Sequence, residues 1–219
     1  KFNGVTMLSY AISQNNCDLV EYLISVGATV DQPNDNGIYP IHAAIHTNIA
    51  MTRLIVDSFP SELDRQTVNK FQTPLMLAIG KYYTETIDFL IHKGASENIR
   101  DVFGNTVLHY SMIKTNLHAV RMLKYHSVEN YFRMTPADYV LNNMKSYFHH
   151  TRNTKVNGIS AQVKGLLTFL VEIYKKHVSI NINKDVRKTV SYKDVMKVNR
   201  YILSRLPDTI KTIPDDLIV

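Results

Sequence analysis

One short pattern recurs four times in this chain at a nearly constant spacing. It follows a Gly-Xaa-Thr-Pro-Leu type of line, and versions of it occupy residues 4–8, 37–42, 71–75 and 104–109. The positions equivalent to its proline are Met7, Pro40, Pro74 and Val107, which are separated by 33, 34 and 33 residues. Because a fixed period of this length is the mark of a stacked repeat, the pattern predicts an array of small units that each contact mainly their neighbours.

Each period is typical of two short helices followed by a turn. In the first unit Thr6 is placed to cap a helix with Leu8 on its apolar face, and the asparagine pair at 15–16 breaks that helix. A second amphipathic helix stops at Gly27, and the third unit stops in the same way at Gly94, two periods later. Since one such pair cannot bury its apolar stripe alone, we expect successive pairs to stack into a continuous core.

From residue 1 to about 140 the chain resembles the ankyrin-repeat family, in about four clear units and a degenerate fifth. The family has a period of about 33 residues and a Thr-Pro-Leu-His-Xaa-Ala signature. The resemblance implies an all-α solenoid of helix-turn-helix units with projecting turn fingers. His42 and His109 stand at the family's histidine position, which ties the backbones of adjacent units, so we expect both to be structural rather than metal ligands.

The departures from the period mark places that need a separate explanation. Unit two loses about one residue before its second helix, and residues 59–63 replace the usual Gly-Ala, so we expect a longer or differently bent connection. Phe71 replaces the finger glycine of unit three. We expect it to pack against the preceding finger, and an exposed contact residue is the alternative. Thr135-Pro136 follows Val107 by only 29 residues, which indicates a shortened, degenerate fifth unit.

The chain divides by charge as well as by pattern. Residues 1–140 hold 11 Lys+Arg and 13 Asp+Glu, a net charge of −2, whereas residues 141–219 hold 14 and 6, a net charge of +8. We expect ankyrin repeats over 1–147 and a basic, helical C-terminal cap over 148–219. A solvated surface, an acidic partner, nucleic acid or a membrane-surface helix are alternative uses of the basic segment. Residues 206–213 resemble the opening of F-box-like motifs, which would make the chain an adaptor for a ubiquitin ligase.

The sequence predicts no catalytic residue, no cofactor site and no metal site. The sequence has no phosphate-binding glycine loop and no zinc-type Cys/His spacing, so we do not expect an enzyme. The single cysteine, Cys17, cannot form an internal disulfide, which favours a reducing compartment: the cytoplasm, with the nucleus as the alternative. Neither a long apolar run nor a charged-then-apolar leader is present, and because the chain opens on Lys1 we interpret it as a fragment or a trimmed protein.

The predicted function is protein–protein recognition by a monomer through the concave surface of the array, with nucleic acid not the expected partner. The frequent Lys, Asn, Ile and Tyr and the absence of Trp fit an AT-rich genome, which favours a viral or intracellular-pathogen protein that modulates a host factor. Tyrosine is favoured at binding hot spots, so the Tyr82-Tyr83 pair is of most interest. Register with the family gives these candidate contacts: Asn34, Asp35, Asn36, Ile38, Tyr39, His46, Thr47, Lys70, Phe71, Gln72, Lys81, Tyr82, Tyr83, Val102, Phe103, Asn105, Lys114 and Thr115.

Overall fold

The computed structural model describes residues 5–124, 128–136 and 138–139. Two compact units make up the chain, residues 1–137 and 138–219, and the helices named below belong to the first. The predicted boundary at 147/148, the C-terminal capping helices and the F-box-like segment all lie outside the described residues.

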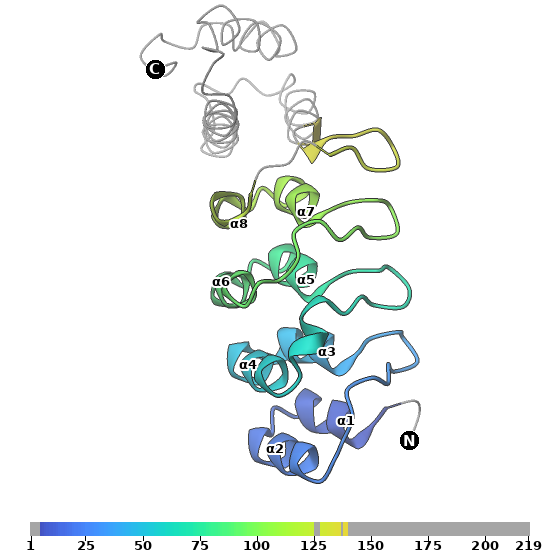
Figure 1. The fold of residues 1–219 in the computed structure, drawn as a ribbon, viewed down its shortest axis with the longest axis vertical. Coiled ribbons are helices and arrows are strands. Elements are labelled where there is room, and N and C mark those ends of the chain that lie inside the picture. The colour runs from blue at the N-terminus through green and yellow to red at the C-terminus, as the bar shows by residue number, and fades with distance from the viewer. Residues whose placement is uncertain (1–4, 125–127, 137, 140–219) are drawn as a thin grey trace, which may run out of the picture. The chain divides into compact units, whose positions relative to one another are not determined.

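Four pairs of helices follow one another along the first unit (Figure 1). The first helices of the pairs are α1 (Met7–Ser13), α3 (Pro40–Thr47), α5 (Pro74–Gly80) and α7 (Val107–Ile113). The second helices are α2 (Cys17–Ser25), α4 (Ile49–Ser58), α6 (Thr84–His92) and α8 (Leu117–Met122), and a short 3-10 helix, η1 (Pro60–Asp64), follows α4. The predicted helix-turn-helix units are confirmed for these four repeats.

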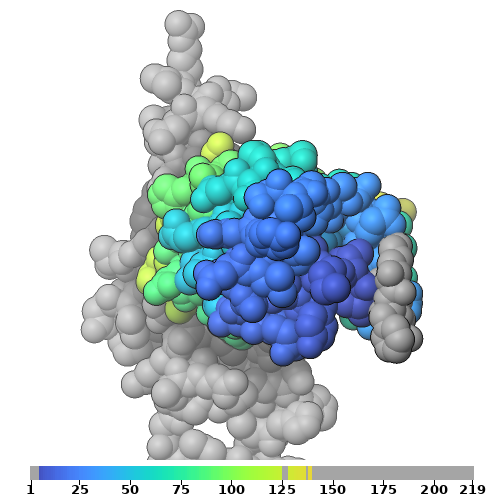
Figure 2. Space-filling model, turned by 90° about the horizontal axis from the view of Figure 1, so that it is seen from below, coloured from blue at the N-terminus to red at the C-terminus, as the bar shows by residue number. Residues whose placement is uncertain are grey.

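The pairs stack so that like helices touch like helices. Contacts join α1 to α3, α3 to α5 and α5 to α7 in one row, and α2 to α4, α4 to α6 and α6 to α8 in the other. Figure 2 views this stack from the end that holds α1 and α2, with the later units behind them. The first-helix row lies beside the projecting fingers, as Figure 1 shows, and we call the surface made by the fingers and these helices the finger-side face.

The core repeats with the same period as the sequence. Ile12, Ile45, Ile79 and Met112 occupy equivalent positions in the four first helices, and each is at most 1% exposed. Burying one side chain of this size contributes about 1.5–3 kcal/mol relative to leaving it in water. The preceding position is always small (alanine in three units and serine in the fourth) and fully buried, which lets neighbouring helices approach closely.

Side-chain caps begin several of the helices, and the cap predicted at Thr6 is confirmed. The Thr6 hydroxyl accepts a hydrogen bond from the Ser9 amide at the start of α1, and Thr73 does the same for the Met76 amide in α5. Asparagine caps α2, α4 and α8, where Asn16, Asn48 and Asn116 each accept a backbone amide, whereas α6 follows Tyr83 and has no side-chain cap. These caps satisfy backbone donors that have no partner inside the helix.

Unit two departs from the others at both places that the sequence marks. In the other three units, the turn between the paired helices contains a residue with positive φ: Asn15, Tyr82 or Thr115. Unit two has no such residue, because Asn48, which is extended (φ −172°), ends α3 and caps α4 at once. After α4 the chain enters η1 instead of a glycine turn, so the expected difference in this connection is confirmed.

A candidate protein-binding face

The fingers are hydrogen-bonded turns held by one polar side chain each. Three of them begin with Asn34, Asp101 and Asn130. One side-chain oxygen of each accepts hydrogen bonds from the backbone amides two and four residues later. The finger of unit three differs because Thr67 opens it and because its turn holds four residues, 68–71, between Thr67 and Gln72. The turns that Asn34 and Asp101 open hold three residues each between their paired ends, so the turn of unit three is one residue longer.

Backbone hydrogen bonds join each finger to the next. The Val68 amide donates to the Gly37 carbonyl at 3.0 Å, the Val102 amide to Lys70 at 3.1 Å and the Tyr131 amide to Phe103 at 3.1 Å. Side chains add further links, for example from the Asn69 amide group to the Asn36 carbonyl. Backbone bonds of this kind leave the turn side chains free to project while the turn backbone is held in place.

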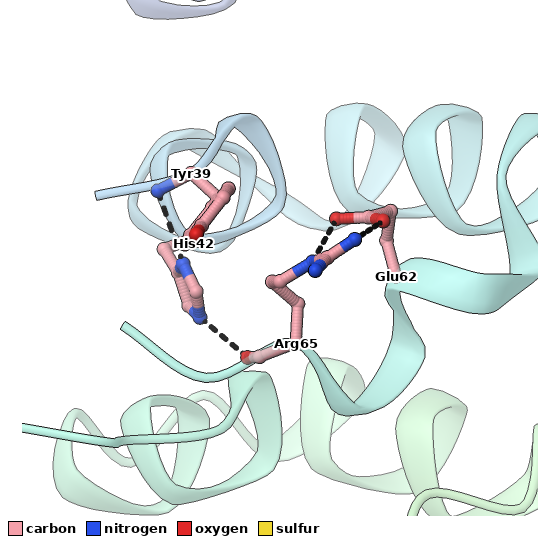
Figure 3. Close-up of polar contacts among 4 residues, drawn as sticks. All are labelled: Tyr39, His42, Glu62 and Arg65. Carbon is pink, nitrogen blue, oxygen red and sulfur yellow. Dashed lines mark hydrogen bonds and ion pairs between the residues drawn. The ribbon is translucent and has the colours of Figure 1, made fainter. Parts of the chain in front are cut away.

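Two buried histidines tie successive units together, as predicted. The Nδ1 atom of His42 accepts from the Tyr39 amide, and its Nε2 atom donates to the Arg65 carbonyl of the next unit at 2.8 Å (Figure 3). His109 makes the equivalent bonds with the Thr106 amide and the Met134 carbonyl. Burial lowers the pKa of His42 to about 4 and also lowers the pKa of His109, because the charged imidazolium would lose its hydration.

An ion pair lies beside Tyr39, at the base of the finger that Asn34 opens in unit two (the second finger). The Arg65 guanidinium donates to both carboxylate oxygens of Glu62, at 2.9 and 2.5 Å (Figure 3). The same guanidinium lies over the Tyr39 ring, 5.1 Å from its centre. The hydrogen bond that Arg65 donates to Glu62 raises the pKa of Arg65. Glu62 is only 2% exposed, so its carboxylate is largely removed from water and hydrogen-bonds Arg65 instead. The connection through η1 therefore fixes Tyr39, one of the predicted contacts.

Most of the predicted contact residues lie on the surface. On the finger-side face, Lys70, Lys81 and Lys114 are exposed, and Val102 and Phe103 are 40% and 50% exposed. His46 is exposed as well, and its pKa is lowered first by partial burial and then by the positive charge of Lys81. The remaining candidates are exposed or half-buried, with one exception.

That exception is Asn105, whose prediction needs correction. It is 6% exposed, its backbone amide and side-chain amide donate to the Asp101 carboxylate, and its side-chain oxygen accepts from the Asn130 amide group at 2.8 Å. Asp101 also accepts from the Tyr110 hydroxyl, which in turn accepts from Gln72. Asn105 thus joins two fingers from inside, and it is not available to a partner.

A second correction concerns Phe71. The expectation that it packs against the preceding finger is wrong, since the side chain is 48% exposed. Its φ of +53° lies in the left-handed region, where Gly37 and Gly104 stand in two other fingers. Phenylalanine lacks glycine's freedom there, so unit three keeps an exposed apolar side chain at a backbone position that favours glycine.

Tyr82 and Tyr83 are exposed by 55% and 37%. The Tyr82 hydroxyl donates to the Lys114 carbonyl of the next unit, and the residue takes a φ of +60° in the turn between α5 and α6. Tyr82 therefore links two units while most of its ring remains accessible. Both tyrosines stay candidate contacts.

The sequence reasoning missed three exposed apolar residues in the fingers: Val68, Tyr131 and Phe132, which are 48%, 68% and 65% exposed. The two aromatic residues lie in the finger that precedes the predicted fifth unit. Their signal was the asparagine at 130, which opens a turn as Asn34 does in the second unit. The three residues that follow Asn130 form the turn of this finger, so comparison with Asn34 would have located the finger in the sequence.

Within the described part of the chain the polar interior is satisfied. There, every buried side-chain nitrogen or oxygen has a hydrogen-bond partner, and no group of three or more His, Cys, Asp and Glu side chains could hold a metal ion. Among the same residues, no helix combines the length and apolar character needed to cross a membrane.

A model of ankyrin repeats (3 copies) matches residues 8–101. These residues are ankyrin repeats. The chain is 30% identical over 126 residues to the probable 26S proteasome regulatory subunit p28 of Saccharomyces cerevisiae, which covers 55% of each chain. It is equally identical over 126 residues to ankyrin repeat protein OPG189 of Variola virus, covering 57% of this chain and 21% of that one. The chain thus spans about half or less of the length of these relatives.

The fold is shared with a solved structure, the ankyrin repeat domain of Bcl-3. The TM-score is 0.58 at 20% identity, and the match covers 62% of this chain and 63% of that one. Ankyrin repeats form extended binding surfaces from stacked units and typically lack a catalytic centre. The repeats of this chain are accordingly a protein-interaction scaffold.

Proposed function

We propose that this chain is a non-catalytic binder that occupies the surface of a host protein through its finger-side face. The observation that carries the proposal is that a hydrogen-bonded backbone framework presents exposed aromatic side chains. Finger backbones are joined by hydrogen bonds from unit to unit, whereas Phe103 on one finger and Tyr82 on a neighbouring turn project into solvent. A rigid framework lowers the entropy that the side chains lose on binding.

The likeness to OPG189 of Variola virus supports a viral or pathogen origin, and the single cysteine supports a reducing compartment such as the cytoplasm. A monomer suffices for this role, because the finger-side face lies within one chain.

Capture from an animal-cell extract tests the proposal. The full chain and a Tyr83→Ala, Phe103→Ala variant are immobilised, and the proteins held by each are compared by mass spectrometry. A Tyr22→Ala variant is the matched control, since Tyr22 is 62% exposed on α2 in the other row of helices. We expect at least one protein to bind the chain and the control but not the variant. If every captured protein binds all three alike, the finger-side face is not the binding surface.

The two alternatives from the sequence concern residues outside the described part. Deleting 204–219 would abolish association with a ubiquitin ligase if the chain is an adaptor. Steep loss of affinity with salt would indicate that the basic segment binds nucleic acid.

A further inference from the structure

Exposed apolar side chains occur on three successive fingers of the described part of the chain. We call Val68, Phe71, Val102, Phe103, Tyr131 and Phe132 the finger ridge. They are 40–68% exposed. Single exposed apolar residues are ordinary, but a contiguous group of them marks an interaction site.

Ring contacts and backbone hydrogen bonds make the members of the ridge neighbours. The Phe103 and Phe132 rings lie 6.2 Å apart between centroids at 34°, which is within the range of favourable aromatic pairs. The Val102 amide bonds to the residue before Phe71, and the Tyr131 amide bonds to Phe103. Tyr131 also lies against Gly104, where an added Cβ would come within 2.9 Å of its ring. The ridge is therefore held at fixed spacing by the finger framework.

The three turns that carry the ridge contain only positive formal charge. The turns that carry it, residues 68–71, 102–104 and 131–133, contain Lys70 and Arg133 and no carboxylate, and both cations are exposed. At the base of these fingers Arg100 and Glu129 offset each other in formal charge, and the carboxylate of Asp101 is buried and hydrogen-bonded within its own finger. The second finger is the opposite case, because its turn contains Asp35 and no apolar side chain between Asn34 and Ile38.

The same bias continues on the helices beside the fingers. The sequences of α1, α3, α5 and α7 contain no acidic residue, and exposed Lys81 and Lys114 directly follow α5 and α7. Carboxylates lie instead in the other row, at Asp18 and Glu21 of α2 and at Glu85 and Asp88 of α6. No ion pair joins a described carboxylate to Lys70, Lys81, Lys114 or Arg133.

From this arrangement we propose that the ridge binds an acidic protein segment, whose apolar side chains contact Phe103 and Phe132 while its carboxylates face Lys70 and Arg133. The inference rests on the proposed function and deepens it by naming the site and the chemistry of the partner. Apolar anchors supply most of the affinity at such a surface, and the charges supply specificity and a faster association rate.

The test begins with a random 12-residue peptide library displayed on phage and selected against the immobilised full chain. The most enriched peptide is synthesised with a fluorescent label, and its Kd is measured by anisotropy. We expect enriched peptides to combine Asp or Glu with Leu or aromatic residues. A Phe103→Ala, Phe132→Ala variant should raise the Kd by about tenfold or more, as loss of hot-spot side chains does.

Charge reversal tests the second half of the proposal. Lys70→Glu, Arg133→Glu should raise the Kd by about fivefold at low salt and by less at high salt, because exposed pairs are weak and screened. Lys124→Glu, an exposed lysine after α8, is the control and should leave the Kd unchanged. Circular dichroism and urea unfolding of every variant show that the fold is retained.

Three results of the peptide experiments would overturn the inference. They are enriched peptides without acidic residues, a Kd that the ridge variant leaves unchanged, and a failure to enrich any peptide. Tight binding of a 20-residue oligothymidine that depends on Lys70 and Arg133 would assign the ridge to nucleic acid instead. If ridge-dependent peptides are found while no extract protein depends on the finger-side face, only the proposed host-protein role fails. If extract binding depends on Tyr83 and not on Phe103 or Phe132, only the ridge inference fails.

Discussion

Replacing His42 with glutamine should remove much of the acid sensitivity of the repeat stack. His42 is fully buried, and its neutral ring accepts from the Tyr39 amide while donating to the Arg65 carbonyl of the next unit. Glutamine suits this position, the third of α3, because it can accept the same amide as in a capping box and carries no titratable proton.

The sign follows from proton binding. In the unfolded chain His42 takes up a proton as the pH falls below 6.5, whereas in the folded chain its pKa is about 4. The unfolded state therefore holds more protons between these values, so stability is complete above pH 6.5 and falls as the pH falls toward 4. A pKa difference of this size corresponds to a loss of about 1.4 kcal/mol at pH 5.5 and about 2.5 kcal/mol at pH 4.5.

Urea unfolding followed by circular dichroism at pH 7.5, 6.5, 5.5 and 4.5 measures the effect. At pH 7.5 the variant should be less stable, by about 1–2 kcal/mol, because the amide fills the buried site less well. That gap should shrink as the pH falls and close or reverse near pH 4.5. His92→Gln is the matched control, because His92 lies on α6 and is exposed. A gap that stays constant from pH 7.5 to 4.5 would refute the assignment of acid sensitivity to His42.

Three further changes test the framework of the fingers and turns. Gly104→Ala should cost about 1–3 kcal/mol in urea unfolding, because φ is +78° and the new Cβ would meet Tyr131 at 2.9 Å. Gly27→Ala shares the positive φ without a neighbour within 4 Å, and an equal cost in both would exclude the clash. Thr115→Gly should raise stability by about 1 kcal/mol, since a β-branched residue is strained at φ +52°, whereas Asn15→Gly should gain less. Glu62→Ala should cost about 1–2 kcal/mol in urea unfolding, because Arg65 loses two charged hydrogen bonds while its 38% exposed side chain can be hydrated, and a cost no larger than that of Asp57→Ala at an exposed pair would contradict this.

Much of the fold could be predicted because it repeats. The 33–34-residue period places Thr6 and Thr73 at helix starts and brings Ile12, Ile45 and Ile79 to one buried row. Capping and amphipathic spacing act within a few residues, so they can be read from sequence. The function as a scaffold follows from the same period.

The surface was harder to predict, because exposure depends on what lies beside a residue in the next unit. Asn105 and Phe103 sit in the same finger, yet Asn130 and Asp101 enclose the first while the second stays in solvent. Phe71 was expected inside. The longer turn opened by Thr67 places it outside, and its backbone conformation gave no local signal in the sequence.

By itself the sequence determined the repeat, the helix pairs, the caps and the histidine ties, since each is set by contacts at one fixed spacing. The tertiary structure alone decided which finger residues meet. Backbone bonds between fingers set Tyr131 beside Phe103 and align apolar residues from three units that are about 30 residues apart in the chain. That alignment turns scattered exposed side chains into one surface, because only stacking brings equivalent positions of successive units side by side.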